Sequence, residues 1–172
     1  MKSVVSAGRE QRREYAGDDD RPLGSYLGTL GLYGLTLGVI GAAARLTGRR
    51  PPSVSVWDVV LMTGATHRLS RLLSKGVVTS PLRAPFTRFE GPSGPAELTE
   101  KARGSGVRHA VGELITCPFC VAQWVGTAYA AGLVFAPDAT RLAGATMTAV
   151  AGSDWLQLGY ARLQRSAAQS PG

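Results

Sequence analysis

A chain of 172 residues is long enough for one ordinary domain or one small helical bundle, and it is too short for two sizeable cores. Its net charge of +7 comes from basic residues beside apolar segments, without a stripe of basic and aromatic side chains, which argues against a nucleic-acid partner. The two cysteines, Cys117 and Cys120, lie too close in sequence to hold a fold together, which excludes a disulfide scaffold.

The N-terminal segment, residues 1–21, mixes basic residues with three consecutive aspartates at 18–20. This composition predicts a disordered, charged cytoplasmic tail rather than a signal peptide. The alanines at 42–44 have the small side chains of a cleavage site, but they follow an apolar stretch that is too long for a secretory signal. We therefore expect the chain to keep this tail.

Residues 22–46 are predicted to form the first of four membrane-spanning helices. No charged residue occurs from Pro22 to Ala44, and about twenty apolar residues are enough to cross the hydrocarbon core. The glycines of this segment recur at intervals of three or four, so they share one helical face that a neighbouring helix could approach closely. These glycines are Gly24, Gly28, Gly31, Gly34, Gly38 and Gly41.

Residues 54–74 follow a proline-rich turn and are predicted to be the second span, although charged side chains interrupt the apolar pattern. Asp58 lies beside Trp57 near the outer end of this segment, so we expect it at the membrane interface. A core helix of a soluble protein is the alternative for this segment, because it lacks eighteen uninterrupted apolar residues.

Residues 75–112 are rich in proline, glycine and basic side chains and are predicted to be a long loop that could carry short interfacial helices. Residues 114–136 contain no charged side chain and are predicted to be the third span. Residues 139–161 are predicted to be the fourth span, with Asp154 as its only acid, and a soluble core helix is again the alternative. Residues 166–172 would form a short C-terminal tail.

The predicted fold is therefore all-α, an integral membrane domain over residues 22–165 with a long loop between the second and third spans. The N-terminal tail, the long loop and the C-terminus share one side, which holds most of the basic residues. The positive-inside rule then predicts a multi-pass protein of the cell membrane with both termini and the loop in the cytoplasm. The expected partners are the lipid bilayer and either a second copy or another membrane protein.

The most distinctive local feature is Cys117-Pro118-Phe119-Cys120. Proline is favoured at the first helical position, so Cys117 is predicted to cap the third span. A thiol at that place feels the positive end of the helix dipole, which favours its thiolate, and Cys120 could resolve a mixed disulfide. This interpretation makes the pair a redox site, although the βαβ context of such motifs is missing. Two small packing residues at a membrane boundary are the alternative.

A metal site is the third interpretation of the same pair. Zinc in proteins takes four ligands, and one chain offers Cys117 and Cys120 with His67 and His109 at best. Two chains could share a site built from both cysteine pairs. No cofactor is predicted.

Ionisable groups inside spans are costly and are usually paired. At about 1.5 Å per residue, Arg68 and Asp154 lie roughly 10 and 12 Å from the cytoplasmic boundary, level enough to form an ion pair. Cys120 falls at a similar height on the third span, which predicts a polar cluster at the cytoplasmic end. Arg71 and His67 could instead extend to the interface.

Three stretches of the chain carry a resemblance to a known family. They are His67-Arg68-Leu69-Ser70-Arg71-Leu72-Leu73, Val78-Thr79-Ser80-Pro81-Leu82-Arg83-Ala84-Pro85-Phe86, and Gly112-Glu113-Leu114-Ile115-Thr116-Cys117-Pro118-Phe119-Cys120 with Trp124. Over roughly residues 56–160 the chain resembles the DUF1360 family of uncharacterised small bacterial membrane proteins. The resemblance implies an integral membrane protein without an established activity. It points to Arg68, Arg71, Arg83, Cys117, Cys120 and Trp124 as site residues.

The leading hypothesis is a non-enzymatic membrane protein that acts by interaction or assembly. Its site would be the cytoplasmic-end cluster, with binding residues Arg68, Arg71, Arg83, Trp124 and Asp154. A membrane thiol-redox protein is the first alternative, and a transporter subunit or metal-binding dimer is the second. No nucleophile and base pattern, phosphate loop or paired-carboxylate motif supports a hydrolase or a kinase.

Overall fold

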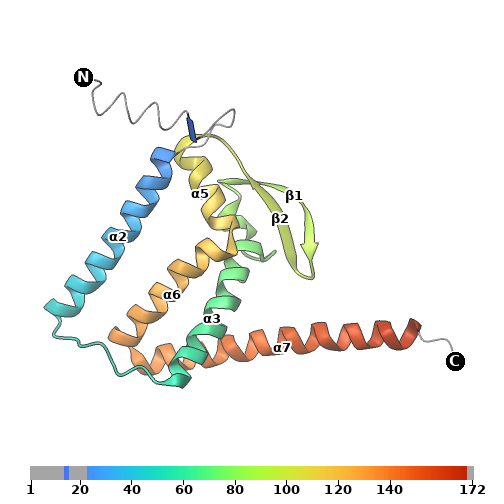
Figure 1. Cartoon of the computed structure of the whole chain (residues 1–172). Coiled ribbons are helices and arrows are strands. Elements are labelled where there is room, and N and C mark those ends of the chain that lie inside the picture. The colour runs from blue at the N-terminus through green and yellow to red at the C-terminus, as the bar shows by residue number, and fades with distance from the viewer. Residues whose placement is uncertain (1–13, 16–22, 170–172) are drawn as a thin grey trace.

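The computed structural model describes residues 14–15 and 23–169, so most of the predicted tail 1–21 and the last three residues lie outside the described chain. The described chain is mostly helical, with one small antiparallel hairpin (Figure 1). The helices are α2 (Leu23–Leu46), α3 (Val56–Lys75), α4 (Ser80–Arg83), α5 (Gly106–Thr116), α6 (Pro118–Phe135) and α7 (Pro137–Gln169), and the strands are β1 (Thr87–Gly94) and β2 (Glu97–Ala102).

Two helices, α2 and α6, are long and apolar enough to cross a membrane. The sequence predicts both of them, because both are free of charged residues over most of their length. The third predicted span begins later than expected: Leu114 belongs to the separate helix α5, and α6 starts at Pro118. Proline lacks the N–H group that a continuous helix would need there, so the chain starts a new helix at this residue.

The core lies where α3, α6 and α7 meet. Ala65, Tyr129 and Leu133 are buried there, and Met62 and Met147 pack against them. Helices α3 and α7 form the most extensive helix contact in the described chain. Helix α7 crosses α3 at an angle (Figure 1). The N-terminal ends of the two helices lie on the same side of the crossing, since Asp58 pairs with Arg141 and Arg68 pairs with Asp154.

Close approach of α3 and α7 depends on Gly64. A β-carbon at this position would lie 2.5 Å from Thr148 Oγ1 and 2.8 Å from Thr148 Cβ. Thr148 in turn donates its hydroxyl to the backbone oxygen of Leu61 at 3.0 Å. A small residue facing a hydroxyl that bonds across the interface is a common way to join helices in membranes.

Helix α2 packs loosely on the rest of the chain. It has no buried residue, and it contacts α6 mainly through Tyr33, whose ring meets Trp124 edge-on at 5.2 Å between centroids. The Tyr33 hydroxyl also accepts a hydrogen bond from the side chain of Gln123 at 2.6 Å. No helix among residues 23–169 packs on its glycine face: a β-carbon would meet nothing within 4 Å at Gly28, Gly31, Gly34, Gly38 or Gly41.

The predicted loop 75–112 is folded. Strands β1 and β2 pair antiparallel, with Thr87 opposite Ala102, and the ladder is irregular around Gly91 and Gly94. These bulges interrupt the alternation of apolar and polar residues that marks a strand in a sequence, so the hairpin was missed. The purely helical prediction is corrected accordingly.

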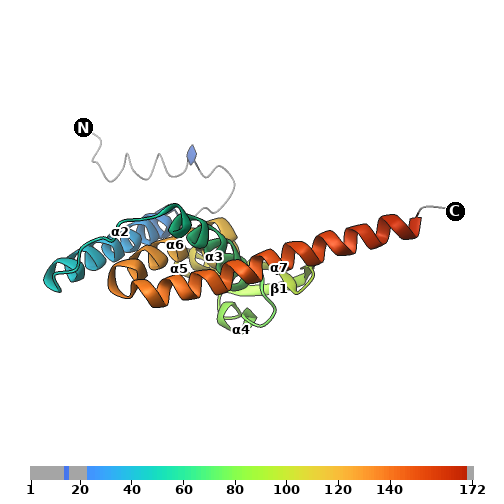
Figure 2. The same ribbon diagram turned by 90° about the horizontal axis from the view of Figure 1, so that it is seen from below.

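Helix α7 is 33 residues long and extends through Gln169, so the predicted tail at 166–169 is helical. Both views show that its C-terminal half projects away from the other helices (Figures 1 and 2). Large side chains on the projecting half, including Leu156 and Leu163, are exposed. A helix of this length spans about 50 Å, more than the hydrocarbon core of a bilayer.

Candidate functional site

The hairpin packs mainly on α5 through β2, and it also contacts the C-terminal end of α3 (Figure 1). Three arginines that the sequence singles out, Arg68, Arg71 and Arg83, all make ion pairs at this end. Two of their carboxylate partners come from β2. The hairpin is therefore attached to the helices by charge pairs as well as by packing.

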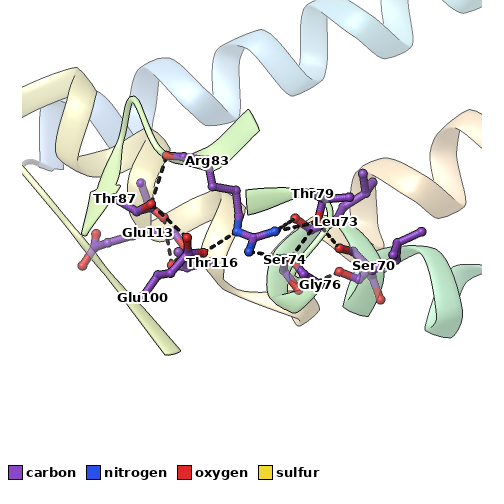
Figure 3. A network of polar contacts seen from close by, with 12 residues as sticks. Ser70, Leu73, Ser74, Gly76, Thr79, Arg83, Thr87, Glu100, Glu113 and Thr116 are labelled. Atoms are coloured by element: carbon purple, nitrogen blue, oxygen red, sulfur yellow. Dashed lines mark hydrogen bonds and ion pairs between the residues drawn. The ribbon is translucent and has the colours of Figure 1, made fainter. Parts of the chain in front are cut away.

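Arg83 is the most buried of the three, with 1% of its surface exposed. Its Nε donates to the Glu100 carboxylate, and its Nη1 donates to the Leu73 backbone oxygen at 2.8 Å and to Thr79 Oγ1 at 2.7 Å (Figure 3). Its Nη2 donates to the Gly76 backbone oxygen at 2.9 Å. One guanidinium thus joins the end of α3, the α4 segment and β2.

The partner side of this pair is also buried and hydrogen-bonded. The Glu100 side chain is 5% exposed, and Thr87 Oγ1 lies 3.4 Å from its carboxylate. The same hydroxyl donates to the Arg83 backbone oxygen at 3.0 Å. Satisfying both charges in this way offsets the cost of taking them out of water. These contacts give Arg83 a structural role. The binding role that the sequence analysis assigns to it stays a prediction.

Arg71 makes a bidentate pair with Glu97, the first residue of β2. Its Nε lies 2.9 Å from one carboxylate oxygen, and its Nη2 lies 2.6 Å from the other. Planar two-point contacts of this kind fix orientation as well as distance. A backbone bridge between Gly76 and Glu97 reinforces the contact. Arg71 is therefore held against the hairpin and is still partly exposed.

Arg68 pairs with Asp154 of α7, with 3.2 Å between Arg68 Nε and a carboxylate oxygen. The pairing inferred from the helix rise is confirmed. Beside it, the His67 ring lies 5.6 Å from the Trp155 ring, centroid to centroid. The two neighbouring contacts join α3 and α7 at the hairpin end of their shared interface.

Asp58 is 3% exposed and forms a capping box with Ser55 at the start of α3. Its expected place at the membrane interface stays a prediction. Arg141 of α7 donates to Asp58 from Nε at 2.7 Å and from Nη2 at 3.3 Å. Buried carboxylates need such partners, and the Ser55-x-x-Asp58 spacing was the available signal for the cap.

Cys117 lies between α5 and α6 with an extended backbone, φ −95° and ψ 107°. Its Sγ accepts a hydrogen bond from the backbone N–H of Cys120 at 3.3 Å, so the predicted helix cap is confirmed. Both residues are free cysteines, and Cys120 is exposed. Residues 14–15 and 23–169 contain no group of three or more metal-ligating side chains that could hold an ion.

A cleft of about 460 Å³ opens between α3 and α6 beside this motif. Pro118 and Phe119 line one wall, and polar residues of α3, including Thr66, His67 and Ser70, line the other. Thr66 Oγ1 is buried and has no hydrogen-bond partner among the described residues. Of the predicted site residues, Arg71 also lines the cleft, whereas Trp124 packs against α2.

The carboxylates Glu97 and Glu100 were missed by the sequence analysis. They lie in the segment predicted to be a loop, and the sequence of a loop does not predict where an acidic side chain points or what it contacts. Arg141 was missed as the partner of Asp58, because the two are 83 residues apart in sequence. The pairs of Arg71, Arg83 and Arg141 depend on how the hairpin and α7 return to α3.

One family of known proteins matches the part of the chain that carries these residues. A family described as "Protein of unknown function (DUF1360)" matches residues 61–160, more than half of the chain. The sporulation protein YjcA of Bacillus subtilis (strain 168) is 35% identical over 69 residues, which are 38% of this chain and 58% of that protein. No solved structure matches the chain. The family match includes the three arginine pairs and both cysteines and begins after α2.

Proposed function

The chain belongs to the family DUF1360, and from this premise we propose that it is a four-span membrane protein that assembles with another protein through its hairpin end. The family is one of unknown function, so the proposal rests on the geometry of the chain. Two parts of that geometry carry it: the alignment of the helices and the surface of the segment between α3 and α6.

The four-span arrangement is supported by how α3 and α7 lie together. In a protein with four spans and both termini on one side, the N-terminal ends of the second and fourth spans lie on the same side, as those of α3 and α7 do. Their charges are paired at both ends of the contact, by Asp58 with Arg141 and by Arg68 with Asp154. Paired charges that face another helix are the form in which such residues are tolerated within membranes.

The proposed topology predicts which engineered thiols an impermeant reagent can reach. In a chain with Cys117 and Cys120 replaced by serine, Ser93→Cys on β1 should resist a membrane-impermeant maleimide in intact cells. The matched variant Ser53→Cys, between α2 and α3, should be labelled, because the positive-inside rule places it outside. Both serines are exposed, so accessibility of the side chain itself does not distinguish them. Labelling of Ser93→Cys before lysis would reverse the orientation.

Exposed apolar side chains on the hairpin end carry the assembly proposal. Leu82 on α4 is 68% exposed and Phe89 on β1 is 65% exposed, and Val78 and Val107 nearby in sequence are exposed as well. The arginine pairs hold the elements that carry these side chains in fixed positions. Apolar residues presented on a rigid, polar-bonded frame are typical of protein interaction surfaces.

Assembly can be tested by cross-linking in native membranes. We expect the wild-type chain to give cross-linked products larger than the monomer, and the Leu82→Ser/Phe89→Ser variant to lose most of them. The control is Leu30→Ser on α2, where the side chain is equally exposed but lies on a candidate spanning helix. Products that persist unchanged in the double variant, or their absence from the wild type, would refute assembly through this surface.

A further inference from the structure

We propose that Cys117 and Cys120 form a dithiol site that exchanges with an organic disulfide at the start of α6. This activity is separate from assembly through the hairpin surface. The two thiols are the only cysteines of the chain, so the disulfide that reacts with them has to come from another molecule.

The local backbone prepares the pair for this chemistry. Cys117 Sγ accepts the N–H of Cys120 at 3.3 Å and lies at the N-terminus of an 18-residue helix, so a hydrogen-bond donor and the positive end of the helix dipole both face this sulfur. Side chains three residues apart on a helix are about 5–6 Å apart at their β-carbons. A disulfide needs about 3.5–4.5 Å. Cys117 lies outside the regular helix, so its torsions can close this gap without unwinding α6.

The surroundings of the pair can accept the reacting molecule. Phe119 is 87% exposed between the two cysteines and lines the adjacent cleft together with Pro118. Cys120 is exposed as well, so an incoming molecule can reach the pair without entering the cleft. The two thiols and the apolar ring of Phe119 therefore lie together at the start of α6.

The exchange proceeds in two balanced steps. The Cys117 thiolate attacks one sulfur of the external disulfide, forming a mixed disulfide and releasing the other sulfur as a thiolate. The Cys120 thiol then loses its proton to solvent and attacks Cys117 Sγ, which closes the internal disulfide and releases the second external thiolate. The external disulfide gains two electrons, and the cysteine pair loses two. The reverse reaction oxidises an external dithiol.

The test is a redox titration of the full-length protein in detergent, with buffers of reduced and oxidised glutathione and a maleimide count of free thiols. We expect both thiols to disappear in one two-electron transition, with a product lighter by two hydrogens and carrying no glutathione. Cys120→Ser should instead accumulate one glutathione on Cys117, because the resolving thiol is missing. A Cys120→Ser protein that carries no glutathione under oxidising conditions would contradict the proposed attack.

Two other results would overturn the proposal. One is that both thiols stay free, or that each takes up glutathione independently, at every ratio of reduced to oxidised glutathione. The other is purified protein with one zinc ion per two chains that blocks the maleimide reaction until a chelator is added. The Phe119→Ser variant distinguishes two kinds of disulfide substrate, a disulfide-linked peptide and oxidised glutathione. Slower exchange with the peptide alone supports a polypeptide substrate. Unchanged exchange with both reagents supports a small disulfide.

Discussion

Replacing Arg83 by leucine should lower the free energy of unfolding by about 3–5 kcal/mol, the typical loss when one partner of a buried ion pair is removed. The variant would leave Glu100 as a buried carboxylate without its countercharge. It would also leave the backbone oxygens of Leu73 and Gly76 without the guanidinium that they bond to. The hairpin should detach from α3 first, since Arg83 is one of the two arginines that join them by ion pairs.

The measurement is thermal unfolding in detergent, together with the rate of proteolysis within residues 87–102. Arg88→Leu is the matched control, because Arg88 is the next basic residue along the chain and is exposed on β1. Arg83→Leu combined with Glu100→Leu should recover much of the loss, since neither charge is then left alone. Equal unfolding midpoints for the Arg83 and Arg88 variants would show that the buried network contributes little.

Gly64→Ala should lower the free energy of unfolding by about 1–3 kcal/mol, as expected when an atom is forced into a packed contact. The added methyl group would meet Thr148 at its β-carbon as well as at its side-chain tips, so rotation of the side chain cannot relieve the overlap. Moving α7 away would break the hydrogen bond from Thr148 to Leu61. The effect should appear as a lower unfolding midpoint.

The control for this variant is Gly38→Ala on α2, where an added β-carbon meets nothing within 4 Å. Alanine favours helix over glycine by about 1 kcal/mol, so this change should not destabilise the chain. The same helix propensity acts at Gly64, and the difference between the two variants therefore isolates the packing contact. A Gly64→Ala protein as stable as Gly38→Ala would mean that α3 and α7 are farther apart than described here.

Local and regular features of the fold could be predicted from the sequence. The candidate spans α2 and α6 follow from uninterrupted apolar runs, and the Cys117 cap follows from the proline after it. The Arg68 to Asp154 pair was predictable because a constant helix rise converts residue numbers into depth. Each of these inferences uses a regular local geometry and needs no information about distant segments of the chain.

Features that depend on how distant segments meet could not be predicted. Glu97 and Glu100 become partners of Arg71 and Arg83 only when the irregular hairpin folds back onto α3. The glycine spacing of α2 shows where a helix could approach, but it does not show that a helix of the same chain does so. Gly64, one of the glycines that are in close contact, stands in a segment without a comparable repeat.

The length of α7 gives this helix the geometry of a lever. Its contact with Arg68 is at Asp154, and the helix continues from there to Gln169. At about 1.5 Å per residue the free arm is about 22 Å long, so each degree of tilt at the contact moves its end by roughly 0.4 Å. A tilt of α7 that barely changes its contact with α3 at the ion pair would therefore displace the C-terminal end of the helix by a distance several times larger.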